Sequence, residues 1–465
     1  MSEFWTSDHV AQALAPLSPV NLPCGPRGFS RVWTDTRTIA AGDLFVALVG
    51  EKFDAHDFVR EAVEKGAAGV VVARVDGAKG LGVPVYEVRD TLVALGALGR
   101  YRRCAWGGPV VGVVGTNGKT STKELLKAAL EPALETHATY GNLNNLVGVP
   151  LTLLSIPDSA EVAVVEMGTN QPGEVPRLRA IVEPNITVVT SIAEEHLEGL
   201  GDLAGVMREE LAACEGVASA VIPASQPEVV AEARRRARRV IAAGLDTGDV
   251  RATRWELAAD GSGWLEVDGV GIRPPLRGLH NLRNTMLAVA VARELGVPLP
   301  DAATGIARMP LPPMRSNVEQ LGRATLVNDA YNSNPGSARA ALELLEHAGK
   351  GRQRVAVLGT MLELGPSGPA LHDALAREAL ASGLELVAGI GEFARALESV
   401  GLADPATRER IVTADDVDSL WNRLASRLSP DAVILLKASR GMRLERLVPQ
   451  IRAWAEQKQG PGPRG

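Results

Sequence analysis

Short hydrophobic segments of strand length alternate with helix-period segments along almost the whole chain. This alternation favours α/β units with mostly parallel sheets, because parallel strands are joined by helix-length crossovers. The clearest strand candidates are the apolar runs at residues 69–75, 110–115, 162–168, 186–192, 355–359 and 432–439. The pattern therefore predicts the α/β fold class.

Two breaks in the alternation suggest domain boundaries. The first is the AWGGP segment at 105–109, and the second is the proline-dense PLPPM segment at 310–314. They give three predicted domains, at 1–108, 109–311 and 312–465, each long enough for its own core. Gly and Asp-Gly turns between 250 and 275 predict β-hairpins, which we expect to add antiparallel strands to the middle domain. The terminal QKQGPGPRG segment is expected to be disordered.

The composition is that of a globular protein, with 46% hydrophobic and 22% charged residues among 465. A net charge of −6 argues against a general nucleic-acid binder. Three scattered cysteines fit a reducing compartment better than a disulfide framework or a zinc site. We see no secretory signal and no apolar run of membrane-spanning length, so we expect a cytoplasmic protein without an integral membrane segment.

A glycine-rich loop, GVVGTNGKTS at residues 112–121, lies between a predicted strand and a predicted helix. Backbone N–H groups of such a loop converge on phosphate oxygens, and the helix N-terminus adds positive potential. Lys119 would reach the β- and γ-phosphates, and the Thr120 hydroxyl would bind Mg²⁺. Val113 stands where the strict pattern has glycine, so the loop is a variant. Alone, it predicts a nucleoside triphosphate site and no particular reaction.

The same loop resembles the ATP loop of the Mur ligases, the ATP-dependent amide-forming enzymes of peptidoglycan precursor synthesis. The resemblance covers nearly the whole chain, and its motifs fall in the family's order. These motifs are YGNLNNLVGVP at 140–150, EMG at 166–168, SIAEEHLEG at 191–199, GLHNLRN at 278–284 and DAYNSNP at 329–335. The resemblance implies a central P-loop-type domain with a mostly parallel sheet. An N-terminal UDP-binding α/β domain and a C-terminal Rossmann-like domain would flank it.

The resemblance also assigns roles to individual positions. The implied ATP-binding residues are Gly115, Thr116, Asn117, Gly118, Lys119, Thr120, Ser121, His280, Asn281, Asn284, Arg315 and Asp329. The implied residues for the UDP substrate are Asp35, Thr36, Arg37, Gly50, His56, Asn142 and Asn145. Those on the D-alanyl-D-alanine side are Tyr331, Asn332 and Asn334. Two departures stand out: Met314 replaces the glycine that usually precedes the arginine, and Thr360 replaces an aspartate in LGTMLELG.

The family also implies two bound Mg²⁺ ions, with Glu166 and His196 among the ligands. Relatives usually carry a carbamylated lysine downstream of the histidine, but no lysine occurs here between Lys127 and Lys350. Aligning the segment after the histidine places Glu210 at that position, with Glu209 as the fallback. A carboxylate and a carbamate are both planar anionic oxygen ligands suited to Mg²⁺. The alternative is that Glu210 lies on a solvated helix face.

The implied metal-binding residues are thus Thr120, Glu166, His196 and Glu210, and the implied catalytic residues are Lys119, Glu166, His196 and Glu210. The implied reaction joins D-alanyl-D-alanine to UDP-N-acetylmuramoyl-tripeptide at the expense of ATP, through an acyl phosphate. We expect a monomer whose last domain closes about the 310–314 segment. Read alone, a glutamate at a strand end, a single histidine or a surface arginine such as Arg37 is more often structural or solvated.

Three other functions remain open from the sequence. A ligase that adds a diamino acid normally carries a DNPR-type motif, which we do not find. A folate-polyglutamating enzyme would not need the first domain. A nucleotide-binding regulatory protein that has lost the chemistry would fit the missing lysine and Thr360. Phosphate release that depends on both ligase substrates separates these possibilities.

Overall fold

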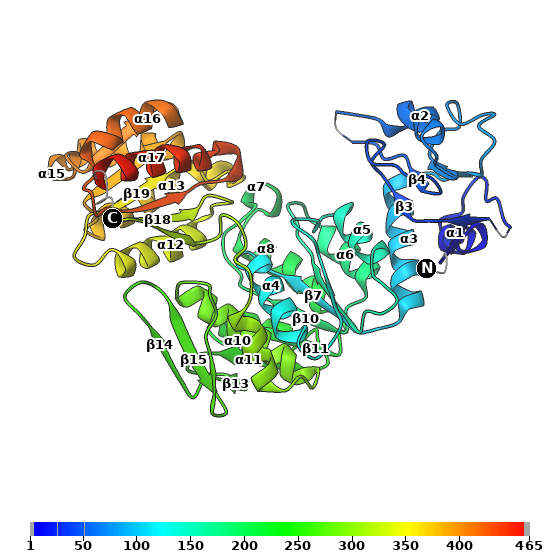
Figure 1. Ribbon diagram of the computed structural model, residues 1–465, viewed down its shortest axis with the longest axis horizontal. Coiled ribbons are helices and arrows are strands. Elements are labelled where there is room, and N and C mark those ends of the chain that lie inside the picture. The colour runs from blue at the N-terminus through cyan, green and yellow to red at the C-terminus, as the bar shows by residue number, and fades with distance from the viewer. Residues whose placement is uncertain (1–3, 26, 51, 460–465) are drawn as a thin grey trace, which may run out of the picture. The chain divides into compact units, whose positions relative to one another are not determined.

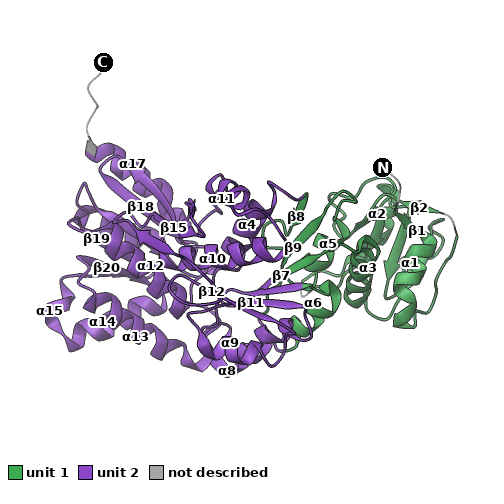
Figure 2. Cartoon of the chain, turned by 90° about the horizontal axis from the view of Figure 1, so that it is seen from below, with its two compact units in different colours: residues 1–112, 135–169, 173–185 green, residues 113–134, 170–172, 186–465 purple. Residues whose placement is uncertain are grey.

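The structure is a computed structural model that describes residues 4–25, 27–50 and 52–459. The prediction of a disordered end at 457–465 is wrong for residues 457–459, which belong to the last helix, and residues 460–465 lie outside the described residues. The chain forms two compact units, coloured separately in Figure 2. Unit 1 comprises residues 1–112, 135–169 and 173–185, and unit 2 comprises residues 113–134, 170–172 and 186–465. The three-domain division made from the sequence stays a prediction beside this one.

Unit 1 contains a parallel sheet in the order β3-β4-β5-β6. Leu95 and Leu98 of α3 belong to the core on one face of this sheet, and Val59 and Ala62 of α2 to the core on the other. The strands of unit 1 are β1 (Trp5–Thr6), β2 (Gly28–Phe29), β3 (Val32–Trp33), β4 (Leu44–Val46), β5 (Gly69–Val72), β6 (Val85–Glu87), β8 (Thr136–Ala138) and β9 (Val162–Glu166). Its helices are α1 (Ser7–Leu14), α2 (Val59–Glu64), α3 (Thr91–Trp106), α5 (Gly148–Leu154) and α6 (Glu174–Val182).

The first part of unit 2 is built on the parallel strands β10 (Ile186–Val189), β11 (Ser219–Pro223), β12 (Val240–Gly244) and β13 (Val250–Arg251). Strand β7 (Val110–Val114) contributes residues to both units. The helices of this part are α4 (Lys119–Leu130), α7 (Leu197–Leu200), α8 (Leu203–Leu211), α9 (Pro227–Ala233), α10 (Leu279–Glu294) and α11 (Leu299–Ala307). Strands β10 and β11 are buried along their length, which explains their largely apolar sequences.

An antiparallel sheet in unit 2 confirms the predicted hairpins. It consists of β14 (Arg254–Leu257), β15 (Gly263–Val267) and β16 (Val270–Ile272), and β14 and β15 are labelled in Figure 1. Asp268 and Gly269 join β15 to β16 with φ angles of +49° and +79°. Positive φ at both central residues is what a type I′ hairpin turn requires.

The last part of unit 2 is a sheet in the order β17-β18-β22-β19-β20-β21. Only the β17–β18 pairing is antiparallel. Its strands are β17 (Asn317–Leu321), β18 (Ala324–Asp329), β19 (Arg354–Leu358), β20 (Leu386–Ile390), β21 (Ile411–Ala414) and β22 (Val433–Lys437). Its helices are α12 (Pro335–Ala348), α13 (Gly368–Ala381), α14 (Glu392–Ala403), α15 (Pro405–Arg408), α16 (Val417–Leu424) and α17 (Leu447–Gln459).

The strand candidates read from the sequence are confirmed as β5, β7, β9, β10, β19 and β22, and the α/β fold class is confirmed with them. The DAYNSNP segment begins at the carboxyl end of β18, beside the carboxyl end of β22. Open parallel sheets bind ligands at that edge. None of the helices among the described residues is long and apolar enough to cross a membrane.

Candidate active site

The glycine-rich loop follows β7 and leads directly into α4. Gly115 and Gly118 have φ angles of +116° and +89°. A Cβ atom at Gly115 would lie 2.6 Å from the Thr190 hydroxyl, and one at Gly118 would lie 2.8 Å from the Asn284 amide. Both positions therefore require glycine for conformation and for space. The N-terminus of α4 begins at the next residue, Lys119, where its N–H groups suit an anion.

Ser191 and Ala193, which follow β10, form hydrogen bonds with this loop. The Thr116 N–H donates to the Ser191 carbonyl at 2.8 Å, and the Asn117 N–H donates to the Ser191 hydroxyl at 3.1 Å. The Thr116 hydroxyl donates to the Ala193 carbonyl at 3.2 Å. Because its polar groups are satisfied by a neighbouring strand end, the loop backbone is held in place by the protein itself.

Lys119 folds back over the loop. Its Nζ donates to the carbonyl of Gly115 at 2.5 Å and to that of Thr116 at 3.3 Å. The same Nζ lies 3.8 Å from the Glu195 carboxylate, and the lysine side chain is 13% exposed. The positive charge is therefore fixed at the glycine-rich loop of residues 112–121, where the sequence motif predicts it. This segment is called the phosphate loop below, because its motif predicts phosphate binding.

Glu210 lies on α8 and is buried, at 2% exposure. Its Oε2 accepts a hydrogen bond from the Gly115 N–H at 2.8 Å. Burial raises the pKa of the Glu210 carboxyl, against the opposing effects of the Lys119 charge and the Gly115 N–H. The alternative of a solvated helix face is therefore wrong: the carboxylate points into the phosphate loop. Glu209, the fallback, is also buried.

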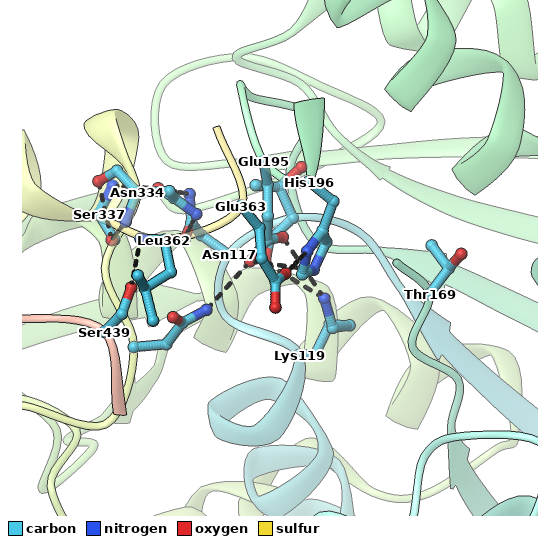
Figure 3. Close-up of polar contacts among 12 residues, drawn as sticks. Asn117, Lys119, Thr169, Glu195, His196, Asn334, Ser337, Leu362, Glu363 and Ser439 are labelled. Atoms are coloured by element: carbon cyan, nitrogen blue, oxygen red, sulfur yellow. Dashed lines mark hydrogen bonds and ion pairs between the residues drawn. The ribbon is translucent and has the colours of Figure 1, made fainter. Parts of the chain in front are cut away.

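His196 is held between two carboxylates in Figure 3. Its Nδ1 contacts Glu363 Oε2, and its Nε2 lies 3.7 Å from Glu195 Oε1. His196 and Glu363 both have positive φ, +52° and +64°, which is uncommon for residues with a side chain. Glu195 and Glu363 were missed as site residues. Their signals were the acidic pair before the histidine and the glutamate inside LGTMLELG.

A cavity of about 150 Å³ lies in unit 2 next to this group. It is lined by Glu195, His196, Asn332, Ser333, Asn334, Leu362, Glu363, Leu364, Ser439, Arg440 and Gly441. The lining brings together four segments that are far apart in the sequence: SIAEEHLEG, DAYNSNP, LGTMLELG (358–365) and KASRGM (437–442). It is therefore a pocket on which polar side chains from four separate segments converge, and convergent polar groups are a feature of ligand sites.

Glu166 ends β9 in unit 1 and is 1% exposed. Its Oε1 accepts a hydrogen bond from the Asn144 amide at 2.9 Å, and its N–H donates to the Thr139 hydroxyl at 2.9 Å. Asn144 belongs to the 140–150 segment and was not among the predicted site residues. It orients the carboxylate of Glu166.

Magnesium is implied by the family resemblance. Within the described ranges, no three His, Cys, Asp or Glu side chains form a group that could hold a metal ion. Mg²⁺ is usually bound through one or two carboxylates together with water and substrate phosphates, so such a group is not required. The buried carboxylates of Glu166 and Glu210 are donors of the right chemistry.

Three of the implied ATP-binding residues, His280, Asn281 and Asn284, lie at the start of α10. Asn281 donates through Nδ2 to the Arg277 carbonyl at 2.8 Å, and Asn284 donates to Asn281 Oδ1 at 3.2 Å. Burial lowers the pKa of His280 to about 4, with Asp329 acting in the opposite direction. At neutral pH this imidazole is uncharged and able to accept or donate a single hydrogen bond at each nitrogen.

Asp329 ends β18 and forms an ion pair with Lys437 at 2.8 Å, at the carboxyl end of β22. Its other oxygen accepts a hydrogen bond from the Ser316 N–H at 2.8 Å. Lys437 is 3% exposed. This pair joins two neighbouring strands where the DAYNSNP segment begins.

The remaining predicted residues of this part have partners within unit 2. The Arg315 guanidinium lies 4.2 Å from the centre of the Tyr331 ring. Asn332 donates to Glu195 Oε1 at 3.3 Å. Asn334 caps α12 and pairs with Asn117, so a direct contact between its amide and a dipeptide would require these bonds to break.

Most UDP-substrate residues of unit 1 lie at its surface. Arg37 is paired with Asp35 at 2.7 Å and its side chain is 86% exposed. Thr36 is half-buried, and Gly50 and Asn142 are exposed. Their assignment to the UDP substrate stays a prediction.

Asn145 and His56 instead support their own loops. Asn145 Oδ1 accepts the N–H of Gly148 at 2.8 Å at the start of α5. His56 is 5% exposed; its Nδ1 lies 2.6 Å from Asp54 Oδ1, and its Nε2 accepts the Ala73 N–H at 2.8 Å. Both ring nitrogens are occupied, so His56 stabilises this loop and offers no ring nitrogen to a substrate.

Comparison with known protein families gives three matches in chain order. Residues 29–103 match the Mur ligase family catalytic domain, residues 113–292 the Mur ligase middle domain, and residues 314–440 the Mur ligase glutamate ligase domain. A curated relative from Synechocystis, named UDP-N-acetylmuramoyl-tripeptide–D-alanyl-D-alanine ligase, is 34% identical over 91% of this chain and 92% of its own length. The chain belongs to the Mur ligase family. The resemblance read from the motifs is thereby confirmed.

Solved structures of this family agree with the fold. A crystal structure of MurF from Acinetobacter baumannii is 30% identical, with a TM-score of 0.85 over 97% of this chain and 99% of that one. MurF ligase from Thermotoga maritima, solved in complex with ADP, is 27% identical, with a TM-score of 0.79 over 92% of this chain and 98% of that one. The Mur ligase fold therefore extends over nearly the entire chain.

Proposed function

We propose that this chain is the ATP-dependent ligase that joins D-alanyl-D-alanine to the terminal carboxylate of UDP-N-acetylmuramoyl-tripeptide in peptidoglycan precursor synthesis. The observation that carries the proposal is the extent of the match, because the alignment covers 92% of the length of a relative with that name. This chain itself carries the phosphate loop and the DAYNSNP segment. The diamino-acid ligase and the folate enzyme are less well supported, because the DAYNSNP segment is present and the first domain matches the Mur ligases.

The reaction proceeds by transfer of the ATP γ-phosphoryl group to the substrate carboxylate, which gives an acyl phosphate and ADP. The amine of D-alanyl-D-alanine attacks the acyl carbon, and the tetrahedral intermediate loses phosphate to leave the amide. Lys119 neutralises charge on the moving phosphoryl group, and the N-terminus of α4 orients it. Such catalysis consists mainly of positioning and electrostatic stabilisation.

Two Mg²⁺ ions, when bound, neutralise the phosphate charge, and we propose Thr120, Glu166, His196 and Glu210 as their protein ligands. Glu210 would supply directly the anionic oxygens that relatives obtain from a carbamylated lysine. Its burial beside the Gly115 N–H supports this role, because a buried carboxylate without a function would be costly.

The Glu210 assignment makes activity independent of CO₂. Enzyme stripped of CO₂ should ligate at the same rate with and without added bicarbonate. Glu210→Ala should lose most activity, whereas Glu215→Ala, on an exposed position beyond the same helix, should not. Recovery of activity by bicarbonate, or full activity of Glu210→Ala, would contradict the assignment.

We propose that Asp35, Thr36, Arg37, Gly50, Asn142 and Asn145 bind or shape the UDP-substrate site, and that Tyr331 and Asn332 lie on the dipeptide side. Arginine and loop N–H groups suit a diphosphate. We also propose that the protein is cytoplasmic and monomeric, and ultracentrifugation of the purified chain tests the oligomeric state.

Phosphate release measured with each substrate omitted in turn tests the whole proposal. Release should require ATP, UDP-N-acetylmuramoyl-tripeptide and D-alanyl-D-alanine together. Lys119→Ala should abolish it, while Lys127→Ala, on the same helix with a half-exposed side chain, should retain it. ATP binding without substrate-dependent release would favour the nucleotide-binding regulatory protein instead.

A further inference from the structure

A reciprocal amide pair joins the phosphate loop to the DAYNSNP segment. Asn117 Nδ2 donates to Asn334 Oδ1 at 3.1 Å, and Asn334 Nδ2 donates to Asn117 Oδ1 at 2.8 Å, as Figure 3 shows. The two residues are 217 positions apart in the sequence, and Asn117 precedes the proline-dense 310–314 segment whereas Asn334 follows it. Both belong to unit 2.

The pair does more than cap a helix. Asn334 Oδ1 also accepts the Ser337 N–H at 2.8 Å, which caps α12. That bond alone would be made equally well by a serine or aspartate. The side-chain NH2 group of Asn334, in contrast, takes no part in the cap and donates its hydrogen bond to Asn117 Oδ1. Asn334 is 3% exposed, so both halves of its amide are used inside the protein.

A second contact runs in parallel. Asn332 donates to Glu195 Oε1 at 3.3 Å, and Glu195 Oε2 lies 3.8 Å from Lys119 Nζ. The Asn332 carbonyl accepts a hydrogen bond from Nζ of the buried Lys437 at 2.6 Å. The 332–334 segment is therefore anchored to β22 on one side and contacts the phosphate-loop groups on the other.

We propose that Asn117 and Asn334 are positioning residues, whose amide pair fixes the phosphate loop against the 332–334 segment and so sets the placement of Lys119 during phosphoryl transfer. This role rests on the proposed ligase function and adds to it a pair that works across the chain. It also replaces dipeptide recognition as the role of the Asn334 side chain. Small errors in the placement of a reacting group cost rate far more than affinity.

Asn334→Ser separates the pair from the cap. Serine is a good N-cap residue, so the bond to the Ser337 N–H is retained, but its side chain is too short to reach Asn117. Asn117→Ala removes the pair from the other side and leaves the Asn117 backbone bond to Ser191 intact. Ser337→Ala is the matched control, because it removes the other half of the capping box and leaves the amide pair in place.

The experiment measures kcat and the KM for ATP of the full chain in the ligation assay, with the thermal midpoint of each variant. We expect Asn334→Ser and Asn117→Ala each to lower kcat by about 10–100-fold. The double variant should be no slower than the slower single variant, because each change removes the same pair. The KM for ATP should stay within about threefold, and Ser337→Ala should keep the wild-type kcat even if its midpoint falls.

Multiplicative losses in the double variant, an equal loss of kcat in Ser337→Ala, or wild-type kcat in Asn334→Ser would each overturn the positioning role. A loss confined to the KM for ATP would also overturn it, since it would indicate uniform binding. A wild-type chain without dipeptide-dependent phosphate release overturns the proposed function as well. An active wild type with unchanged variants overturns only the pair.

Discussion

Replacing Lys437 by methionine tests how strongly a buried ion pair stabilises the last sheet. The Lys437 ammonium lies 2.8 Å from Asp329 Oδ2 and 2.6 Å from the Asn332 carbonyl. The lysine side chain is 4% exposed and the aspartate side chain 14%. Methionine has a similar unbranched shape and fills most of the same space, so the change removes charge with little cavity formation.

The magnitude follows from what the lysine leaves behind. Removing one partner of a buried ion pair costs about 3–5 kcal/mol, because the other charge stays buried without compensation. Asp329 keeps the hydrogen bond from the Ser316 N–H at 2.8 Å and some contact with solvent. We therefore expect a loss of about 3 kcal/mol for Lys437→Met, at the lower end of that range.

Urea unfolding followed by circular dichroism measures the loss, with Lys79→Met as the control. Lys79 has a side chain that is 75% exposed, so its replacement should change stability by less than about 0.5 kcal/mol. The double variant Lys437→Met/Asp329→Asn removes both charges, keeps an acceptor for the Ser316 N–H and should recover most of the stability. The reasoning would be refuted by a loss under about 1 kcal/mol, or by a double variant as unstable as the single one.

Three further predictions concern other groups. Met314→Gly should stabilise the chain by about 0.5–1 kcal/mol in urea unfolding, because Met314 has φ of +54° and left-handed backbone strains a residue with a side chain; a destabilised variant would argue against strain there. Glu210→Gln keeps an acceptor for the Gly115 N–H and removes a buried charge. Because the pKa of Glu210 is raised, the native state loses stability as the pH rises through that pKa. The variant should therefore have a higher melting temperature than wild type at pH 7–8, and this difference in melting temperature should disappear in acid. Its ligation rate should fall at least about 100-fold. The pKa shift of Asp54 has the opposite sign, because its pKa is lowered to about 2. The stability that Asp54 contributes above the ordinary value of 3.8 should disappear as the pH falls to about 2. The difference in melting temperature between wild type and Asp54→Asn should shrink over that interval.

The cause of the Asp54 shift lies in its hydrogen bonds. Burial alone would raise the pKa of this carboxyl, but the His56 backbone N–H, the His56 ring and the Arg74 guanidinium outweigh it. Because hydrogen bonds within this loop and to Arg74 lower the pKa, the shift indicates a structural role for Asp54. It agrees with the placement of His56 as a support of the same loop.

Sequence reasoning worked best where a short segment determines its own structure. The buried strands β7, β9 and β22 are recognisable because both faces of a parallel sheet require apolar residues. The phosphate loop is recognisable because Gly115 and Gly118 have no acceptable substitute. The Asp-Gly turn of the β15–β16 hairpin follows from the same local constraint.

The sequence alone did not show which side chains satisfy one another in the folded chain. His56 was assigned to the substrate, and that assignment stays a prediction; in the structure its two ring nitrogens lie against Asp54 and the Ala73 N–H. Glu363 received no role, although it contacts His196 from 167 positions away. Asn334 was assigned to the dipeptide, and its partner is Asn117. No spacing rule predicts such contacts, because they depend on how separate elements pack.

The amide pair also bears on how the protein ages. Asn117 is followed by Gly118, and an asparagine before glycine is the sequence most prone to spontaneous deamidation through attack of the next backbone nitrogen on the side-chain carbonyl. The two bonds to Asn334 engage both the oxygen and the nitrogen of that side-chain amide. Because the amide pair holds the Asn117 side chain in place, deamidation of Asn117 should occur mainly in molecules in which the pair with Asn334 is broken.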